Sequence, residues 1–403
     1  MERIRPTLTY LVVASASALG LWAALSLPRH RPTPPITEKP QPVAEKPQPV
    51  PVQVPKTVQR PQVDVVFVLD TTGSMGLLIS GAKKKIWELA RFIAQGQPAP
   101  AVRIGLVAYR DVGDEYVTKF FDLTDDMDGV YQNLASFSAA GGGDTPEHVA
   151  KALHDAVYRS SWSPGKNTLK MVYLVGDAPP HSDYQDGFNH RVIAREASSQ
   201  GIRINTVRCG HDEDTRVSFT EIASITGGDS SSIEQSGGMQ DIRTPFDEDL
   251  AGLNRALTET AIPYGDAERR ASIRRKAENN LEAPVEAQAA RAGWFGLAKT
   301  RGRAAALSDG DLLDDVANNK VRLEAVAPSA LPEAMQGMSA EERGRFIEAK
   351  RKARDEVLRQ INRLSAKRDD YIHKNHAPST SGFDGKVRET VKKQAADIGL
   401  DYF

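Results

Sequence analysis

Three oxygen-bearing side chains follow an apolar run near residue 70. The segment VVFVLDTTGSM, residues 65–75, ends its apolar run in Asp70 and then places hydroxyl groups at Thr72 and Ser74. Oxygens spaced two residues apart suit a hard divalent cation. The same residues also fit a strand end followed by a turn, with Ser74 as the cap of the next helix. Other segments of the chain must decide between these interpretations.

Two further segments place oxygens at the ends of predicted elements. GGGDTPEH, residues 141–148, carries Thr145 in a loop that opens a helix, and LKMVYLVGD, residues 169–177, ends a strand in Asp177. In a doubly wound sheet, ligands bind beyond the carboxyl ends of the strands. Convergence there favours a metal site over separate caps, with five candidate ligands: Asp70, Thr72, Ser74, Thr145 and Asp177.

Strands and helices alternate regularly around these residues. VDVVFVLD, residues 63–70, is a continuous apolar run rich in β-branched side chains, which is typical of a strand buried on both faces. The remaining pattern predicts further strands at 102–111, 169–177 and 203–209, an edge strand at 116–124, and helices at 77–94, 126–138, 146–158 and 191–199. We therefore expect an α/β domain with a doubly wound, mostly parallel sheet.

The three loops resemble the metal-ion-dependent adhesion site of von Willebrand factor A (VWA) domains. DTTGS at residues 70–74 is similar to the first loop of that site, D-x-S-x-S, with Thr72 in place of the first serine. GGGDTPE looks like the second loop, and VGDAPPH looks like the third, where Gly176 replaces a frequent threonine. The resemblance implies a Rossmann-like VWA domain over residues 62–265.

Carried over to this chain, the resemblance makes Ser74, Thr72 and Thr145 direct hydroxyl ligands. Asp70 and Asp177 would act mainly through bound waters. The implied cation is Mg²⁺, with Mn²⁺ or Ca²⁺ as alternatives, and it retains a position for water. An Asp or Glu of a partner protein would fill that position, so the implied function is protein binding and not catalysis.

Three other functions compete with protein binding. A Mg²⁺-dependent phosphatase of the haloacid dehalogenase type needs a second acid two residues after the first, where this chain has Thr72. A serine hydrolase would need a G-x-S-x-G elbow, which does not surround Ser74. The third rival is a structural envelope protein in which the metal site is vestigial.

Residues near the loops have two interpretations each. Asp144 and Glu147 either orient metal-bound waters or favour the amino terminus of a helix. His181 either reaches the metal or a partner carboxylate or is an exposed loop histidine, and the exposed position is expected because Mg²⁺ prefers oxygen. Cys209, the one cysteine of the chain, is expected to be a buried small residue, and it excludes an intrachain disulfide.

The beginning of the chain predicts a membrane tether. Residues 7–27 carry no charge and are long enough to span a bilayer. We expect residues 1–28 to be a signal-anchor in a bacterial inner membrane, with a cleaved signal peptide as the competing interpretation. Residues 29–61 are proline-rich and contain EKPQPV twice, which favours an extended spacer. The rest of the chain would then be periplasmic.

The remaining residues, 266–403, are predicted to be mainly helical. The segment 339–371 begins with a capping box, Ser339 to Glu342, and its incomplete heptads favour a docking helix or a hairpin over a long coiled coil. Residues 269–284 are highly charged and are expected to form a mobile connector. The stretch 62–265 is acidic, which argues against nucleic acid as a partner.

Overall fold

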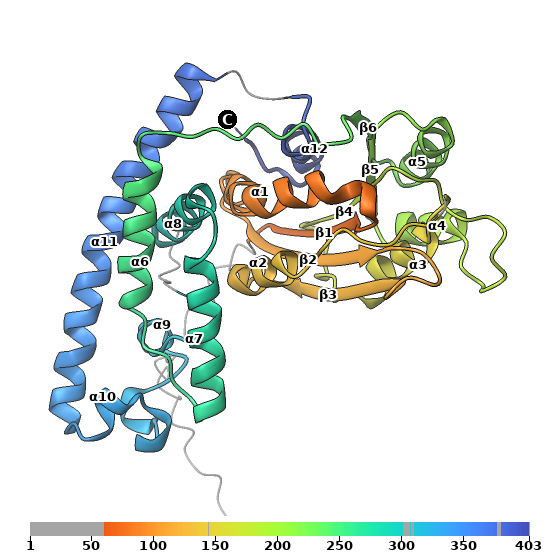
Figure 1. Ribbon diagram of the computed structural model, residues 1–403. Helices are drawn as coiled ribbons and strands as arrows, with labels where there is room; N and C mark the ends of the chain where they lie inside the picture. The colour runs from red at the N-terminus through yellow and green to blue at the C-terminus, as the bar shows by residue number, and fades with distance from the viewer. Residues whose placement is uncertain (1–59, 144, 301–306, 308–309, 377–379, 403) are drawn as a thin grey trace, which may run out of the picture. The chain divides into compact units, whose positions relative to one another are not determined.

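The computed structural model describes residues 60–143, 145–300, 307, 310–376 and 380–402. They form one six-stranded sheet flanked by helices (Figure 1). The strands are β1 (Gln62–Asp70), β2 (Ala101–Tyr109), β3 (Thr118–Thr124), β4 (Thr168–Gly176), β5 (Ile202–Cys209) and β6 (Ser230–Ile233). The predicted membrane segment, residues 7–27, lies outside the described residues. Among the residues that are described, no helix combines the length and apolar character needed to cross a membrane.

The sheet has the order β3-β2-β1-β4-β5-β6. All neighbouring strands are parallel except β2 and β3, which are antiparallel. This confirms the predicted mostly parallel sheet and the edge strand near 116–124. The chain adds β2 on one side of β1 and β4 on the other, so the strand order reverses beside β1. The carboxyl ends of β1 and β4 therefore border the crevice where such sheets bind ligands.

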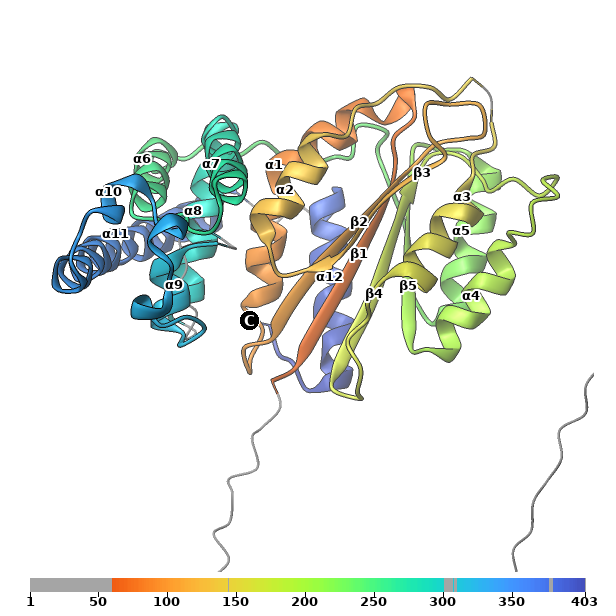
Figure 2. The ribbon, with the colours of Figure 1, turned by 90° about the horizontal axis from the view of Figure 1, so that it is seen from below.

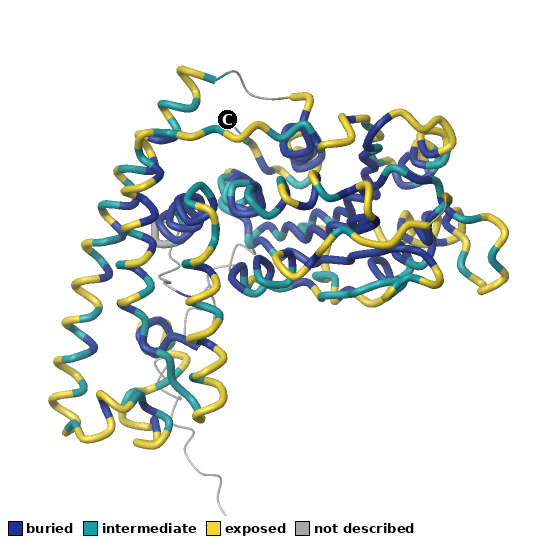
Figure 3. The backbone as a smooth tube through the Cα atoms, viewed as in Figure 1, coloured by how far each residue is buried: buried dark blue, intermediate teal, exposed yellow. Residues whose placement is uncertain are grey.

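Helices cover both faces of the sheet (Figure 2). One face carries α1 (Gly76–Ala94), α2 (Met127–Ala135) and α12 (Phe383–Ala395), and the other carries α3 (Val149–His154), α4 (His190–Ser199) and α5 (Glu213–Thr226). A π-helical turn, Asp155–Arg159, continues α3. Side chains of β1 alternate between the two apolar cores, with Phe67 in the first and Val66 and Val68 in the second. The strands are accordingly buried throughout the centre of the sheet (Figure 3).

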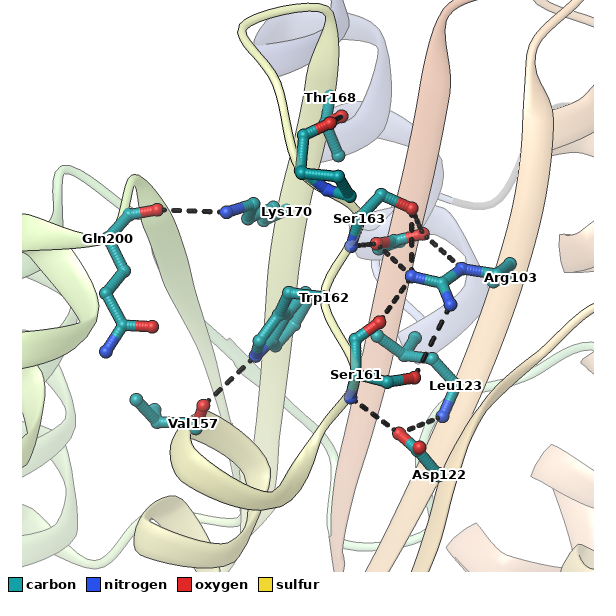
Figure 4. Close-up of polar contacts among 12 residues, drawn as sticks. Arg103, Asp122, Leu123, Val157, Ser161, Trp162, Ser163, Thr168, Lys170 and Gln200 are labelled. Carbon is teal, nitrogen blue, oxygen red and sulfur yellow. Dashed lines mark hydrogen bonds and ion pairs between the residues drawn. The ribbon is translucent and has the colours of Figure 1, made fainter.

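A buried ion pair ties the amino-terminal ends of the strands together. Arg103 of β2 donates two hydrogen bonds to the carboxylate of Asp64 of β1, at 3.0 and 2.8 Å. The same guanidinium reaches the Ser161 carbonyl at 2.6 Å and the Ser163 hydroxyl at 2.8 Å in the loop before β4 (Figure 4). Asp64 is fully buried, and a buried carboxylate needs such partners. At this end of the strands, the polar side chains are therefore paired with one another. The candidate site lies at the opposite end of the strands.

A helical region lies between β6 and α12. Its helices are α6 (Asp247–Glu259), α7 (Ala267–Leu281), α8 (Val285–Thr300), α9 (Leu312–Ala317), α10 (Glu333–Gln336) and α11 (Ala340–Asn375). The prediction of a mobile connector at 269–284 was wrong, because most of it is the helix α7. The predicted capping box of Ser339 and Glu342 is confirmed. Buried apolar residues of α11, such as Leu358 and Ile361, join the core that also holds α8, as expected of a docking helix.

The end of the chain returns to the sheet and completes its core. Phe383 of α12 packs edge-on against Phe67 of β1, with ring centroids 6.0 Å apart. The Tyr173 hydroxyl of β4 donates to the Val387 carbonyl at 3.3 Å, and the ring of Tyr402 stacks on Phe92 of α1. The predicted domains, 62–265 and 266–403, stay predictions. The apolar core of the sheet contains residues from both of them.

Phe383→Ala tests whether α12 is part of this core. Phe383 is 2 % exposed, and a buried Phe→Ala change costs about 3–5 kcal/mol. We expect a loss of that size in the free energy of unfolding, measured by chemical denaturation with a single transition. Lys392→Ala, at an exposed position of the same helix, should stay within about 0.5 kcal/mol of the original chain. Equal stability of the two variants would contradict the packing of α12.

Candidate metal centre

The first loop gathers its oxygens directly after β1. The backbone N–H and the hydroxyl of Thr72 both donate to Oδ1 of Asp70, at 2.8 and 2.7 Å. The Ser74 Oγ lies 3.3 Å from the Thr72 Oγ1. Neither the turn Gly73–Met75 nor α1 has a side-chain cap, so the interpretation of Ser74 as a helix cap was wrong. Ser74 is exposed. Its hydroxyl lies beside the Thr72 hydroxyl, which donates to Asp70.

Strand register brings Asp177 to the same place. Leu69 of β1 pairs with Val175 of β4, so Asp70 is level with Gly176 and Asp177 follows immediately. The Asp177 Oδ2 accepts a hydrogen bond of 2.6 Å from Gln235 Nε2, in the loop after β6. Gln235 was not predicted, and only the tertiary structure brings it here.

The glycine run of the second loop passes closely over the first loop. The Gly73 N–H donates to the Gly141 carbonyl at 3.2 Å. At Gly142, with φ +75°, a Cβ atom would lie only 2.9 Å from the Thr72 Cβ and 3.3 Å from Oε1 of Glu147. The glycines therefore permit a close approach of the backbone. Thr145 follows Gly142 and precedes Glu147 in this loop, and it is exposed.

Carboxylates crowd the site. Burial raises the pKa of Asp70 to about 7, and the charge of Asp177 adds to this rise while hydrogen bonds from Thr72 oppose it. Burial also raises the pKa of Glu147 to about 9, and the negative charges of four aspartates contribute: Asp70, Asp111, Asp114 and Asp177. The side chain of Glu147 faces this cluster instead of solvent at the start of α3, since the residue is 3 % exposed.

Three carboxylate oxygens of this cluster are buried without a hydrogen-bond partner among the described residues: Oδ2 of Asp70, Oδ1 of Asp111 and Oε2 of Glu147. Unpaired buried carboxylate oxygens are costly, and a bound cation would compensate them. No group of three or more His, Cys, Asp or Glu side chains in the described part of the chain is arranged as a metal site. A cation here would therefore depend on the hydroxyl oxygens of Thr72, Ser74 and Thr145, and the donor set fits a hard, oxygen-preferring ion.

Tyr109 fills the space left by Gly176. A Cβ at Gly176 would lie 2.2 Å from the Tyr109 hydroxyl and 3.2 Å from Oδ2 of Asp70. The fully buried Tyr109 pairs in register with Asp70, and its hydroxyl donates to the Val175 carbonyl at 3.3 Å. The position that a threonine side chain would occupy thus holds a phenol hydroxyl from β2, on the far side of β1.

The prediction of an exposed loop histidine at 181 was wrong. The His181 side chain is 8 % exposed, and its Nδ1 lies 2.8 Å from Asp183. Its ring stacks on Tyr184 with centroids 3.9 Å apart, and the Tyr184 hydroxyl donates to Asp111 at 2.6 Å. Asp111 was not singled out, although it ends the predicted strand 102–111 as Asp70 ends its own strand. Cys209 is 1 % exposed, as predicted.

The part of the chain that matches a known protein family is the part that forms the sheet. Residues 64–235 match the family model of the von Willebrand factor A domain. This stretch runs from β1 to the loop after β6 and includes all three loops of the candidate site. The match therefore covers the α/β part of the chain and leaves out the helices from α6 onward.

Curated relatives match less than half of this chain. An ariadne-like RING finger protein of Acanthamoeba polyphaga mimivirus is 26% identical over 185 residues, which are 41% of this chain and 18% of that protein. The von Willebrand factor A domain-containing protein 7 of Rattus norvegicus is 35% identical over 120 residues, 30% of this chain and 12% of that protein. The chain thus spans less than a fifth of the length of these relatives.

Solved structures include the conserved hypothetical protein BatB from Bacteroides thetaiotaomicron. It is 16% identical to this chain, with a TM-score of 0.33, and the match covers 43% of this chain and 90% of that one.

Gly176→Ala tests the packing of Tyr109 against the site. The added methyl group would meet the Tyr109 hydroxyl, which is held in the core, and overpacking of this kind costs about 1–3 kcal/mol. We expect that loss in the free energy of unfolding, measured in the presence of a chelator. Gly252→Ala in α6, where a Cβ meets nothing within 4 Å, should be neutral or stabilise the helix by up to about 1 kcal/mol. A neutral Gly176→Ala would contradict the position of Tyr109.

Proposed function

We propose that this chain is a metal-dependent protein-binding module whose cation is completed by an Asp or Glu of a partner. One observation carries the proposal: Asp70 keeps one buried oxygen without a partner among the described residues, its other oxygen accepts from the Thr72 hydroxyl, and the Ser74 hydroxyl lies 3.3 Å from that of Thr72. The match of residues 64–235 to the VWA family supports it, because VWA domains are generally protein-interaction modules.

The five predicted ligands have distinct roles in this proposal. Thr72, Ser74 and Thr145 would offer neutral hydroxyl oxygens, while Asp70 and Asp177 would balance the charge of the ion. A bound Mg²⁺, or Mn²⁺ or Ca²⁺ in its place, supplies positive charge and a position that an incoming carboxylate can take. Thr72 orients Asp70 through two hydrogen bonds, and Gln235 orients Asp177 through one. The protein thereby keeps the acids in place before a partner arrives.

Binding, and not catalysis, is the function that we propose for this site. In a phosphatase of the haloacid dehalogenase type, an acid two residues after Asp70 would transfer a proton. Here Thr72 occupies that position, and its hydroxyl donates a hydrogen bond to the Asp70 carboxylate. Turnover of a phosphate ester that disappears in Asp70→Asn would overturn this part of the proposal. A vestigial site in a structural protein would be indicated instead if removal of residues 339–371 abolished function and Thr145→Ala did not.

Magnesium binding can be measured without knowledge of the partner. A ligand at about 100 times its Kd stabilises the folded state by about 2.7 kcal/mol. We expect Mg²⁺ to raise the melting temperature of the full chain and a chelator to reverse this rise. Asp70→Ala and Thr145→Ala should each remove most of the Mg²⁺-dependent shift.

Thr220→Ala is the matched control for this titration. Thr220 is an exposed threonine of α5, and its replacement should leave the shift unchanged. Isothermal titration calorimetry with Mg²⁺ should give one site per chain for this control and for the original chain. An equal Mg²⁺ response in all variants would contradict the proposed ligands.

We also propose that residues 7–27 tether the module to a bacterial inner membrane, with the sheet on the periplasmic side. The uncharged stretch and the proline-rich residues 29–61 support this arrangement. Alkaline phosphatase fused to the carboxyl terminus should be active, and a fluorescent protein that requires the cytoplasm should stay dark. The membrane fraction should contain the chain with residues 7–27 intact by mass spectrometry. A shortened chain there would favour the cleaved signal peptide.

A further inference from the structure

A charged cavity lies where α1, α11, α12 and the loop after β6 meet. Its volume is about 460 Å³, and cavities that bind small organic molecules measure about 300–1,000 Å³. Along α1 its lining begins at Lys85, about 14 Å along the helix axis from Gly76 at the helix start. The cavity is therefore separate from the candidate metal centre. We call it the Arg388 cavity, and six of its lining residues carry most of the argument: Lys85, Glu88, Phe92, Ile372, Asp384 and Arg388.

Cations from three helices surround one carboxylate in this cavity. Glu88 accepts hydrogen bonds from Lys85 of α1 at 3.1 Å and from Arg368 of α11 at 3.0 Å, and Arg388 of α12 lies 3.9 Å away. Burial alone would raise the pKa of Glu88, but the positive charges of these three residues lower it to about 2. Arg368 has a second acid, Asp247, at 2.7 Å. Lys85 and Arg388 therefore share Glu88.

Arg388 keeps hydrogen-bond donors for an occupant. Its separation of 3.9 Å from Glu88 is too long for a hydrogen bond. The guanidinium lies 5.0 Å from the centre of the Phe92 ring, and the side chain is 34 % exposed. A guanidinium presents its N–H donors as a planar fork that fits a carboxylate. The Lys85 ammonium also has donors besides the one that Glu88 accepts. Donors in excess at this wall favour an anion.

Apolar side chains line the cavity beside these cations. They are Phe92 of α1, Ile372 of α11 and Ile242 of the loop after β6. An inorganic anion would leave this apolar surface in contact with water, whereas an apolar group attached to the anion would cover it, which is favourable. The lining therefore favours an organic acid over phosphate.

Asp384 is the lining acid that opposes a bound anion. It is a buried residue of α12, one helical turn before Arg388. Burial raises the pKa of Asp384, while the positive charges of Lys85 and Arg388 act in the opposite direction. An ionised Asp384 repels an anion in the cavity. Removal of this charge should therefore strengthen the binding of an acid, whereas removal of the Arg388 charge should weaken it.

We propose that the Arg388 cavity binds a small organic acid. Its carboxylate would accept hydrogen bonds from Arg388 and Lys85, and its apolar part would pack against Phe92, Ile242 and Ile372. Such an acid would contact α1, α11 and α12 together. This site goes beyond the proposed metal-dependent function, because none of the groups that would hold the acid belongs to the metal centre.

Calorimetric titration of the full chain in chelator, at pH 8, tests this site. The probes are hexanoate, benzoate and phenylacetate, each compared with its primary amide, together with inorganic phosphate. His373 and His376, which also line the cavity, are largely neutral at this pH. We expect at least one of the acids to bind at one site per chain, and we expect its amide and phosphate to bind at least about tenfold more weakly.

Two variants with opposite expected effects distinguish binding from a structural role. Arg388→Gln should bind the acid about tenfold more weakly, because hydrogen bonds to a charged group are lost. Asp384→Asn should bind it more tightly by about threefold or more, because a like charge is removed. Arg363→Gln, at an exposed position of α11, is the matched control and should bind as the original chain does. Loss of stability alone cannot produce tighter binding in one variant and weaker binding in the other.

Several results would overturn the Arg388 cavity as an acid site. They are the absence of binding for all three acids, equal binding of acids and amides, phosphate binding as tight as that of the acids, and unchanged affinity in Arg388→Gln. Chelator is present throughout, so these results are independent of the metal-dependent function. Failure of the Mg²⁺ titration would in turn leave the acid site standing.

Discussion

The candidate site depends on one constraint, which is the burial of a carboxylate at the end of the central strand. Asp70 is fully buried, and only one of its oxygens is hydrogen-bonded within the described residues. The second oxygen lies among other acids, so the folded chain alone leaves negative charge poorly compensated there. An arrangement of this kind is unfavourable for stability and favourable for a cation. The surrounding loops are best understood as the means of keeping it in place.

The same constraint explains several close contacts around the site. Gly142 lets the second loop approach Thr72, Gly141 leaves space for the Asp114 carboxylate, and Gly176 leaves space for the Tyr109 hydroxyl. Gln235 reaches Asp177 from the loop after β6. Gly176 and Gln235 lie at the ends of β4 and β6, while the glycines at 141 and 142 lie in the loop between α2 and α3. The geometry of the site therefore depends on the register of the strands and on the course of this loop.

The helical region is attached to the α/β part of the chain at both of its ends. It begins after β6, and the chain returns through α12, whose Phe383 enters the core of the sheet. Between these points, Trp294 and Phe295 of α8 pack near Trp87 of α1. α1 begins at Gly76, directly after the turn Gly73–Met75 that carries Ser74 of the candidate metal centre. A change in the packing of the helical region therefore has a direct structural route to the surface that we propose binds the partner.

The sequence by itself determined the strands, the edge strand, the mostly parallel sheet and the capped helix that begins after Ser339, because these depend on local periodicity and capping. It also indicated Asp70, Thr72, Ser74, Thr145 and Asp177 as neighbours, since parallel strands end at one edge. Only the tertiary structure decided the burial of His181, the orientation of Glu147, the contribution of Gln235 and Tyr109, and the return of α12 to the sheet. Those features depend on contacts between residues far apart in the chain, which local patterns do not specify.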